Sequence, residues 1–204
     1  MPVPVKLLLA SSNPGKLREY RVLAAQFSSA TAVELALLPG VDRLPAFDES
    51  TPTFAENAAG KALHYSRFVE LPVIADDSGL VVPALGGAPG VQSARYAGPN
   101  ASDADRVRRL LEELHSKSIT DRRARFVCVL ALAERGRVRA VFSDLASGEL
   151  LEAPRGDRGF GYDPIFFFPP LGKSFAELSR EEKNHVSHRG KAFQKLLAFL
   201  QQPQ

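Results

Sequence analysis

The sequence predicts an α/β protein with a mixed β-sheet flanked by helices, because apolar runs of strand length alternate with segments of helical periodicity. The first apolar run, residues 3–10, suits a strand buried on both faces, and a helical pattern at 17–27 follows it. In the middle of the chain, two apolar runs flank Arg135-Gly136, which is typical of a hairpin. All-α and all-β folds do not fit this order.

In the amino-terminal half, the helices are predicted from apolar spacing and capping residues. Apolar residues such as Tyr20 and Leu23 recur at helical spacing. Thr53 and Glu56 have the capping-box pattern, in which the threonine caps free amides and the glutamate reaches back. In chain order, the predicted elements are a strand at 3–10, a turn at 13–15, a helix at 17–27, a strand at 33–37, a helix from 54 to about 69 and a brief strand at 73–75.

The carboxy-terminal half begins with a segment rich in glycine and proline. Residues 84–100 hold four Gly and two Pro, which indicates a structured loop. Ser102 is predicted to cap the next helix, with Asp103 and Asp105 adding favourable negative charge in its first turn. The remaining predicted elements are a hairpin of strands at 126–133 and 138–142, strands at 148–153 and 165–168, a short helix capped at 174–177 and a final helix at 190–200.

The composition is that of one globular domain, which we expect to span residues 1–204. Hydrophobic residues make up 45% of the chain and charged residues 24%, so there is enough apolar surface to offset the entropy cost of ordering. The single cysteine, Cys128, excludes an internal disulfide and a multi-cysteine zinc site. A reducing compartment fits this cysteine usage best.

Charge and hydropathy favour a cytoplasmic protein without a membrane partner. No stretch approaches the roughly 20 apolar residues of a membrane span, and the apolar run at the amino terminus is too short for a secretory signal. The formal net charge of +3 permits a phosphate-bearing ligand without requiring a nucleic acid. The arginine groups of the second half lack interleaved surface aromatics, which favours a solvated surface over one that binds RNA.

The turn after the first strand partly matches a phosphate-binding loop. Residues 10–17, Ala-Ser-Ser-Asn-Pro-Gly-Lys-Leu, approach the P-loop pattern, but Ala10 replaces its first glycine and Leu17 its hydroxyl residue. This departure disfavours a P-loop kinase. Free amides at a helix N-terminus and the charge of Lys16 could still hold a phosphate. An ordinary strand-to-helix turn fits the same residues equally well.

Two adjacent aspartates, Asp76 and Asp77, are expected where the strand at 73–75 meets a turn. Because neighbouring residues of an extended chain point to opposite faces, only one carboxylate should project into a given cleft. That carboxylate could bind Mg²⁺ or take a proton from water. Nearby acids, among them Asp48 and Glu49, could complete an oxygen-ligand set. The alternative is a pair of solvated turn aspartates.

Two later blocks carry polar and aromatic groups of candidate function. In residues 159–164, Gly-Phe-Gly-Tyr-Asp-Pro, the glycines let the backbone approach a ligand, and a ring could stack on a nucleobase. An aromatic turn packed into the core is the alternative. His188 and Arg189 place positive charge at a helix start, where it is unfavourable, so an anionic or polar neighbour is expected. A solvated His-Arg pair would also fit.

Taken together, these blocks resemble one family, the inosine triphosphate pyrophosphatases, also called non-standard purine nucleoside triphosphate pyrophosphatases. The matching motifs run in family order and cover nearly the whole chain. They are Ser12-Asn13-Pro14-Gly15-Lys16 with Glu19, Phe54-Ala55-Glu56-Asn57-Ala58 with Lys61-Ala62, Ala75-Asp76-Asp77-Ser78-Gly79-Leu80, Gly86-Gly87-Ala88-Pro89-Gly90 with Ser93-Ala94-Arg95-Tyr96-Ala97-Gly98, the block at 159–166, and Glu177-Leu178 with 183–189. Such an ordered set is far more specific than any one motif.

The resemblance implies hydrolysis of a nucleoside triphosphate to the monophosphate and pyrophosphate, with Mg²⁺ as cofactor. The implied substrates are the deaminated purine nucleotides ITP, dITP and XTP, which the reaction removes from the nucleotide pool. The implied fold is an elongated mixed α/β sheet in which two lobes of one domain flank a central cleft. The family also implies a homodimer with no stable nucleic-acid partner.

The resemblance assigns roles to individual residues. Asp77 would act as general base and metal ligand. Asp48 lies at the family's second metal-binding acid, where a glutamate is expected, and Glu49 is the alternative ligand. Phe160 or Tyr162 would stack on the base. The implied substrate-binding residues are Ser11, Ser12, Asn13, Pro14, Gly15 and Lys16 for the triphosphate, and Ser78, Phe160, Gly161, Tyr162, Asp163, Lys183, His188 and Arg189 for the nucleoside and phosphate pocket.

Two other function classes stay open at this point. A related nucleotide pyrophosphatase with different base specificity, for pyrimidine or methylated nucleotides, could share the fold, and a substrate panel would distinguish it. A non-catalytic nucleotide- or RNA-binding module would instead show salt-dependent RNA binding without magnesium-dependent turnover.

Overall fold

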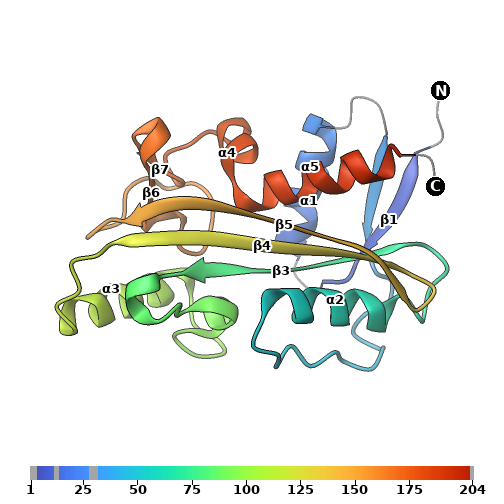
Figure 1. Ribbon diagram of the computed structural model, residues 1–204, viewed down its shortest axis with the longest axis horizontal. Coiled ribbons are helices and arrows are strands. Elements are labelled where there is room, and N and C mark those ends of the chain that lie inside the picture. Colours follow the sequence, from blue (N-terminus) through green and yellow to red (C-terminus); the bar gives the residue numbers. More distant parts are fainter. Residues whose placement is uncertain (1–3, 12–13, 28–31, 203–204) are drawn as a thin grey trace. The chain divides into compact units, whose positions relative to one another are not determined.

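The computed structural model describes residues 4–11, 14–27 and 32–202 (Figure 1). Its strands are β1 (Val5–Leu9), β2 (Val33–Leu37), β3 (Val73–Val81), β4 (Arg123–Glu134), β5 (Arg137–Leu150), β6 (Phe166–Phe168) and β7 (Lys173–Ser174). Its α-helices are α1 (Pro14–Phe27), α2 (Phe54–Tyr65), α3 (Asp103–Ser116), α4 (Arg180–Val186) and α5 (His188–Leu200). Short 3₁₀ helices are η1 (Pro83–Leu85), η2 (Gly90–Arg95), η3 (Asp163–Ile165) and η4 (Pro169–Leu171).

The described strands form one mixed sheet in the order β2-β1-β3-β4-β5-β6-β7. β1 pairs in parallel with β2 and β3, whereas β6 pairs antiparallel with β5 and β7. The chain runs from β1 to β2 through α1 and from β2 to β3 through α2, because parallel strands need a crossover connection, whereas the antiparallel strands β6 and β7 are joined by a short segment that contains η4. The predicted α/β class with a mixed, helix-flanked sheet is therefore confirmed.

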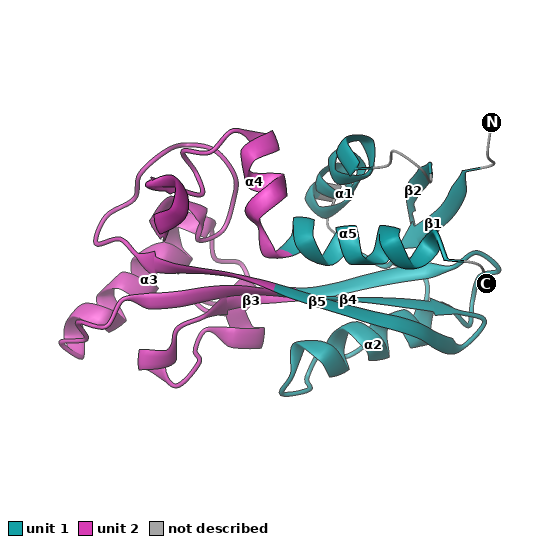
Figure 2. Ribbon diagram, turned by 45° about the horizontal axis from the view of Figure 1, so that its top comes forward, with its two compact units in different colours: residues 1–77, 128–144, 189–204 teal, residues 78–127, 145–188 magenta. Residues whose placement is uncertain are grey.

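The chain divides into two compact units (Figure 2). Unit 1 comprises residues 1–77, 128–144 and 189–204, and unit 2 comprises residues 78–127 and 145–188. The long strands β3, β4 and β5 contribute residues to both units. The expectation of one domain with two lobes around a cleft stays a prediction.

Unit 1 has two cores because its strands are buried on both faces. Leu7 and Leu9 of β1 pack with Tyr20 of α1 and Phe193 of α5. Leu8 points the other way and packs against α2. Figure 1 shows the same arrangement, with α1 and α5 on one face of the sheet and α2 on the other. The continuous apolar run in β1 is thus explained by burial on both faces.

The single cysteine belongs to the first of these cores. Cys128 of β4 is a free, fully buried thiol. Burial raises the pKa of this thiol to about 12. Because the thiolate is the reactive form, Cys128 is a packing residue and a poor nucleophile.

Unit 2 has one core, in which a cluster of aromatic rings packs with aliphatic side chains. Leu110 and Leu114 of α3 face this core, as predicted from their helical spacing. The Phe126 ring of β4 lies 4.6 Å from that of Phe166, and Phe166 lies 4.7 Å from Phe175. Contacts of this kind supply the bulky packing in a chain that has no tryptophan.

Two of the predicted helix caps and the predicted hairpin turn are confirmed. The Thr53 side chain accepts a hydrogen bond from the third residue of α2, and Ser102 forms a full capping box with Asp105. Arg135 and Gly136, between β4 and β5, both have positive φ, as a two-residue hairpin turn requires. The α2 helix ends at Tyr65 and not near 69.

The strand predicted at 73–75 is longer than expected. β3 continues to Val81, so Asp76 and Asp77 lie within a strand and not at its end. The cause is the close packing of Gly79, because a Cβ there would lie 2.4 Å from Ser93 Oγ and 2.5 Å from the Gly90 carbonyl oxygen. The glycine thus allows the strand to run against η2 where a turn was predicted.

Two other element predictions are wrong. The segment 148–153 is no separate strand but includes the end of β5, where the lack of a side chain at Gly148 admits the Phe167 carbonyl oxygen and the Phe166 ring. Residues 174–177 cap no helix. Glu177 accepts a hydrogen bond from the Ser174 amide at 2.7 Å and pairs with Arg155, and the helix begins later, at α4. Within the described residues, no helix is long and apolar enough to cross a membrane.

Candidate active site

The candidate site of unit 1 lies where β3 extends past its neighbour β1. The register between these parallel strands ends at the pair Leu9 and Ile74, and the Ala10 amide donates to the Ile74 carbonyl oxygen at 2.8 Å. Asp76 and Asp77 follow directly on β3. The carboxyl ends of neighbouring parallel strands are the usual place for a ligand site in an open α/β sheet.

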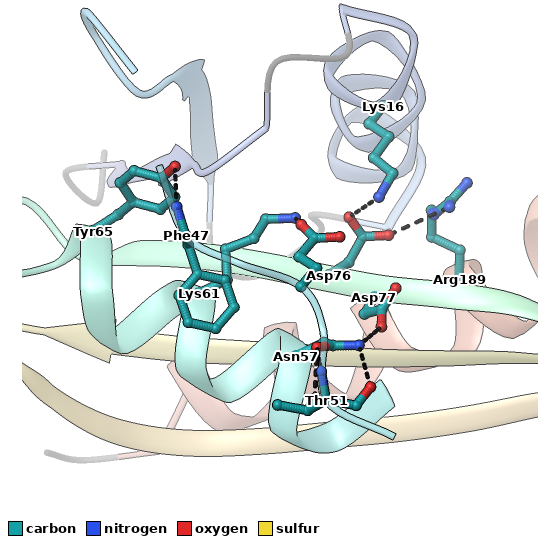
Figure 3. Close-up of polar contacts among 10 residues, drawn as sticks. Lys16, Phe47, Thr51, Asn57, Lys61, Tyr65, Asp76, Asp77 and Arg189 are labelled. Atoms are coloured by element: carbon teal, nitrogen blue, oxygen red, sulfur yellow. Dashed lines mark hydrogen bonds and ion pairs between the residues drawn. The ribbon is translucent and has the colours of Figure 1, made fainter. Parts of the chain in front are cut away.

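The two aspartates point to opposite faces of the sheet (Figure 3). Asp76 contacts Lys16 of α1 and Arg189 of α5. Asp77 instead accepts a hydrogen bond from Asn57 of α2. Because these helices cover opposite faces, the predicted alternation of the two carboxylates is confirmed.

Asp76 is a buried anion held by two cations. Its carboxylate lies 2.9 Å from Lys16 Nζ and 3.3 Å from an Arg189 guanidinium nitrogen. Burial raises the pKa of Asp76, but the positive charges of Lys16 and Arg189 outweigh it and hold the pKa well below the ordinary value. Asp76 is therefore ionised, and it fixes the ammonium group of Lys16 at the start of α1.

Asp77 has the opposite electrostatic setting. Burial raises its pKa, the Asn57 hydrogen bond lowers it, and the negative charge of Glu49 raises it again, with a net increase. Asn57 Nδ2 donates to Asp77 at 2.9 Å, while Thr51 Oγ1 donates to Asn57 Oδ1 at 2.6 Å. Thr51 thereby fixes the orientation of the Asn57 amide, which in turn orients the carboxylate.

Glu49 and not Asp48 is the acid that lies near Asp77. Glu49 is half-buried, forms an ion pair with Lys61 of α2 and is close enough to Asp77 to raise the pKa of that carboxyl group. Asp48 is exposed. Adjacent residues of an extended segment point apart, so only one of the two acids can face the site. The structure therefore favours Glu49 over Asp48 as the second acid.

The predicted triphosphate segment begins in the described residues and ends in α1. Ser11 is buried after β1, and Gly15 and Lys16 lie in the first turn of α1. Pro14 is the first residue of this helix, a position where its missing N–H costs nothing. Ser12 and Asn13 lie outside the described residues. The positive end of the α1 dipole and the Lys16 ammonium group thus lie together.

Arg189 is positioned by two acids. Its side chain is 3% exposed, and the guanidinium group contacts Glu19 of α1 as well as Asp76. The anionic neighbours expected from its place at a helix start are therefore present. Two of its guanidinium nitrogens contact these carboxylates, which links Arg189 through Asp76 to Lys16. Its assignment to the substrate pocket stays a prediction.

In unit 2, residues 159–163 present an aromatic ring to solvent. Phe160 is 50% exposed, and Lys183 Nζ lies 4.9 Å from the centre of its ring. Asp163 is buried, forms an ion pair with Lys183 and accepts a hydrogen bond from the Phe160 amide at 2.8 Å. The predicted residues Phe160, Asp163 and Lys183 are thus brought together.

The remaining predicted residues of unit 2 are more buried. Tyr162 is 3% exposed, and its hydroxyl donates to the Ser93 carbonyl oxygen at 3.0 Å, so its ring packs in the core and Phe160 is the ring available for stacking. His188 is buried, with its ring stacked 4.8 Å from that of Phe126. Ser78 is half-buried in β3.

The arrangement of these residues is found in a chain that matches a known protein family. Residues 7–199 match the model of the Ham1 family, which covers nearly the whole chain. The chain belongs to the Ham1 family. The family expected from the sequence motifs is therefore confirmed.

Named relatives of this Ham1 chain span the same length. It is 50% identical over 191 residues to a dITP/XTP pyrophosphatase of Geobacillus kaustophilus (strain HTA426), covering 94% of this chain and 92% of that one. It is 46% identical to the dITP/XTP pyrophosphatase of Yersinia pseudotuberculosis serotype I (strain IP32953), with 96% and 98% covered. The solved structure of a HAM1 protein from Coxiella burnetii has a TM-score of 0.84 at 42% identity, covering 96% of this chain and 98% of that chain.

The carboxylates of this Ham1 chain fit a magnesium ion that arrives with a phosphate ligand. The described residues contain no group of three or more His, Cys, Asp and Glu that could hold a metal alone. Mg²⁺ in nucleotide enzymes is usually held by one or two carboxylates together with substrate phosphates and water. Asp77 and Glu49 supply two such carboxylates, and their mutual repulsion, which raises the pKa of Asp77, favours a cation between them.

Three residues of the Ham1 site lie in the matched motifs but received no role from the sequence. Asn57, Lys61 and Glu19 hold the groups to which roles were assigned. One signal was present, because Asn57 and Lys61 are polar residues four apart on the inward, otherwise apolar side of α2. The contacts of Glu19 depend on tertiary packing between α1 and α5 and carry no local signal.

Proposed function

We propose that this protein hydrolyses non-standard purine nucleoside triphosphates, namely ITP, dITP and XTP, to the monophosphate and pyrophosphate. One observation carries the proposal: β3 holds a desolvated carboxylate, Asp77, next to an ionised one, Asp76, that fixes the phosphate-binding Lys16. One short segment of β3 thereby supplies a proton acceptor and holds a phosphate-binding cation of α1 in place. The relatives named dITP/XTP pyrophosphatases support the substrate class.

Phosphate binding is assigned to the start of α1 and to Lys16. The helix N-terminus offers free amides and a positive dipole, and the ammonium group adds a full charge. Because Asp76 already holds this ammonium group, a phosphate meets it in a defined place. Preorganised charge of this kind stabilises the pyrophosphate leaving group without reorganisation during the reaction.

Asp77 is assigned the role of general base. Its raised pKa makes the carboxylate a better proton acceptor than an exposed aspartate, while the Asn57 amide keeps it oriented. In the proposed reaction it takes a proton from the water that attacks the α-phosphorus. A bound Mg²⁺, held by Asp77 and Glu49, would supply neutralisation of phosphate charge. Lys61, paired with Glu49, adds positive charge beside these acids.

Base recognition is assigned to residues of unit 2. The exposed Phe160 ring offers a stacking surface, and Lys183 beside it offers a donor for the 6-oxo group of hypoxanthine or xanthine. The 6-amino group of ATP presents donors where an acceptor is wanted. A site whose donors are left unpaired rejects such an analogue strongly.

The homodimer and the cytoplasmic location stay expectations from the family resemblance.

The test is the identity of the products. We expect purified protein with ITP and Mg²⁺ to give inosine monophosphate and intact pyrophosphate, with much slower turnover of ATP. Inosine diphosphate and single phosphate would instead identify a different NTPase, and salt-dependent RNA binding without turnover would identify a binding module.

The base assignment has its own test in a pair of matched variants. Asp77→Asn should lower kcat for ITP by about 100-fold or more, because the proton acceptor is lost. Asp48→Asn, which removes an exposed carboxylate of the same size nearby, should leave kcat near that of the parent. Circular dichroism checks that both variants are folded. Near-normal turnover by Asp77→Asn would refute the base assignment.

A further inference from the structure

The segment that presents Phe160 has little intrinsic rigidity. Phe160 lies between Gly159 and Gly161, whose φ angles of +77° and +62° are in a region that glycine adopts easily. Backbone flanked by two such residues has many accessible conformations when nothing else holds it. The position of the exposed ring therefore depends on contacts made by the neighbouring amides.

On its amino-terminal side, the ring is held from within the segment. The Phe160 amide donates to Asp163 Oδ2 at 2.8 Å. Gly159 packs directly on the same carboxylate, since a Cβ at this position would lie 2.0 Å from Asp163 Oδ2. Asp163 is in turn paired with Lys183 of α4. This side belongs to the site already described.

On its carboxy-terminal side, the ring is held by a residue far away in the sequence. The Gly161 amide donates to Asp103 Oδ2 at 2.6 Å, across 58 residues of chain. The other carboxylate oxygen of Asp103 forms an ion pair with Arg106. The guanidinium group of Arg106 also donates to the Ala101 carbonyl oxygen at 2.7 Å. Asp103 is the first residue of α3, and Arg106 holds its carboxylate through a contact that does not involve the capping residues Ser102 and Asp105. The carboxylate thus has a defined place and orientation.

We propose that Asp103 is a positioning residue for base recognition, which acts on the Phe160 ring through the Gly161 amide. This inference rests on the proposed function, because it assumes that the ring stacks on the purine. Stacking alone is common to all purines, whereas distinguishing a 6-oxo from a 6-amino group requires the base edge to be placed within about 0.5 Å of its donors. The contact from α3 therefore serves discrimination more than affinity for purines in general.

The first test compares three substitutions in the first turn of α3. Asp103→Ala removes the acceptor for the Gly161 amide, whereas Asp103→Asn keeps an acceptor oxygen and removes only the charge. Asp105→Ala is the matched control, because it removes a first-turn acid that caps α3 through the Ser102 amide at 3.0 Å. The measurements are kcat and KM for ITP and ATP and inhibition by pyrophosphate.

We expect Asp103→Ala to lower the ratio of kcat/KM for ITP to that for ATP by about tenfold, the effect of one lost hydrogen bond to a charged group. Pyrophosphate inhibition should not change, because the phosphate-binding residues belong to unit 1. Asp103→Asn should recover most of the ratio, and Asp105→Ala, which keeps the Gly161 and Arg106 contacts of Asp103, should change it much less than Asp103→Ala does. An unchanged ratio in Asp103→Ala would overturn the proposal.

A second readout works without turnover. The chain contains no tryptophan, so Phe160→Trp gives a single tryptophan in this segment, which can be excited selectively over the tyrosines. Adding Asp103→Ala should lower the fluorescence anisotropy of this reporter, whereas adding Asp105→Ala should not. If the protein did not hydrolyse ITP, the proposed function would fail, and the anisotropy would still decide whether Asp103 holds the ring. Equal anisotropy in the two double variants would overturn the positioning role.

Discussion

Asp76 belongs to a series of four charges that alternate in sign from Glu19 through Arg189 and Asp76 to Lys16. Figure 3 shows the last three members of this series. The chain of contacts is neutral overall, which lowers the cost of burying its central members. Asp76 and Arg189 are 1% and 3% exposed, so each depends on its partners in place of water. Removing one end of the series should therefore affect the other.

Glu19→Gln tests this coupling. The substitution removes the negative charge of Glu19, one of the two acids that contact Arg189. The buried guanidinium group then has Asp76 as its remaining charged partner and interacts more strongly with it. We expect the free energy of unfolding to fall by about 1.5–3 kcal/mol, the usual range for a hydrogen bond to a charged group. KM for ITP should rise, because Lys16 is held less firmly. Urea denaturation and steady-state kinetics measure the two effects.

The matched control is Glu34→Gln. Glu34 is 61% exposed and lies 3.9 Å from Lys6 in a surface ion pair. Such a pair adds little to stability in water, so this variant should behave as the parent. If the two substitutions had equal effects on unfolding and KM, the buried charge series would have no special role.

Site residues could be predicted from sequence where a local rule applies. The alternation of Asp76 and Asp77 follows from strand geometry, and the anionic neighbour of Arg189 follows from its unfavourable place at a helix start. The choice between Asp48 and Glu49 depends on which way an irregular segment turns, and no periodicity determines that. Only the pairing of Glu49 with Lys61 reveals it.

Among the elements, two similar capping patterns have different outcomes. Ser174 and Glu177 make one of the two capping-box hydrogen bonds, but Ser174 belongs to β7 and donates its hydroxyl to the Arg155 carbonyl oxygen at 2.6 Å. Ser179 and Glu182 make both bonds and begin α4. The pattern alone cannot tell these cases apart, because the strand pairing of β7 is a tertiary contact.

Ser179→Ala measures what the true cap contributes. The α4 helix has only seven residues, so most of its backbone groups lie near an end and the cap satisfies a large share of them. We expect the free energy of unfolding to fall by about 1 kcal/mol, as for other N-caps. Ser116→Ala is the control. Its exposed hydroxyl in the last turn of α3 donates to the Glu113 carbonyl oxygen, and its loss should cost about 0.5 kcal/mol or less.

The Ser179→Ala substitution should also affect Lys183, because this residue lies on α4. A loosened helix start would weaken the contact of Lys183 with Asp163 and raise KM for ITP. If Ser179→Ala and Ser116→Ala had the same stability and KM, the capping box would contribute nothing measurable to α4.

Strand lengths were the least predictable feature of the elements. The β3 strand is longer than predicted because Gly79 packs against Ser93 and Gly90. The β5 strand includes Gly148, where a separate strand was predicted, because Phe166 and Phe167 pack against this glycine. In both places a glycine that is typical of turns permits close packing within a strand. Sequence reasoning sees the glycine but not the neighbour that needs the space.

At the scale of the whole molecule, the order of apolar segments is sufficient to predict the fold class. Apolar residues on both faces of β1 require helices on both sides, and unit 1 has α1 and α5 on one face and α2 on the other. What the pattern leaves open is which polar groups these layers bring to the end of the parallel strands. Asp76 and Asp77 differ in electrostatic setting only because different helices cover the two faces.

A ligand that binds only the folded protein stabilises the entire chain, so the proposed magnesium and phosphate site can be examined without turnover. Asp77 and Glu49 repel each other, and Lys61 compensates only one of them directly. Mg²⁺ alone should therefore bind weakly. Pyrophosphate alone should also bind weakly, because the two carboxylates repel it. Together they should bind well, with about 2.7 kcal/mol of stabilisation at a hundredfold excess over Kd. For a chain of this size, that corresponds to a rise in Tm of about 5–10 °C.

Thermal denaturation with Mg²⁺, pyrophosphate, both, or both plus EDTA measures this synergy. We expect EDTA to abolish it, and Glu49→Gln to remove most of it by taking away one carboxylate ligand. Asp48→Asn should keep the full rise in Tm, because the exposed Asp48 side chain faces away from Asp77 in our assignment. The reverse result, with synergy lost in Asp48→Asn and kept in Glu49→Gln, would restore Asp48 as the second ligand. Equal shifts with and without Mg²⁺ would argue that phosphate is held by Lys16 and the α1 N-terminus alone.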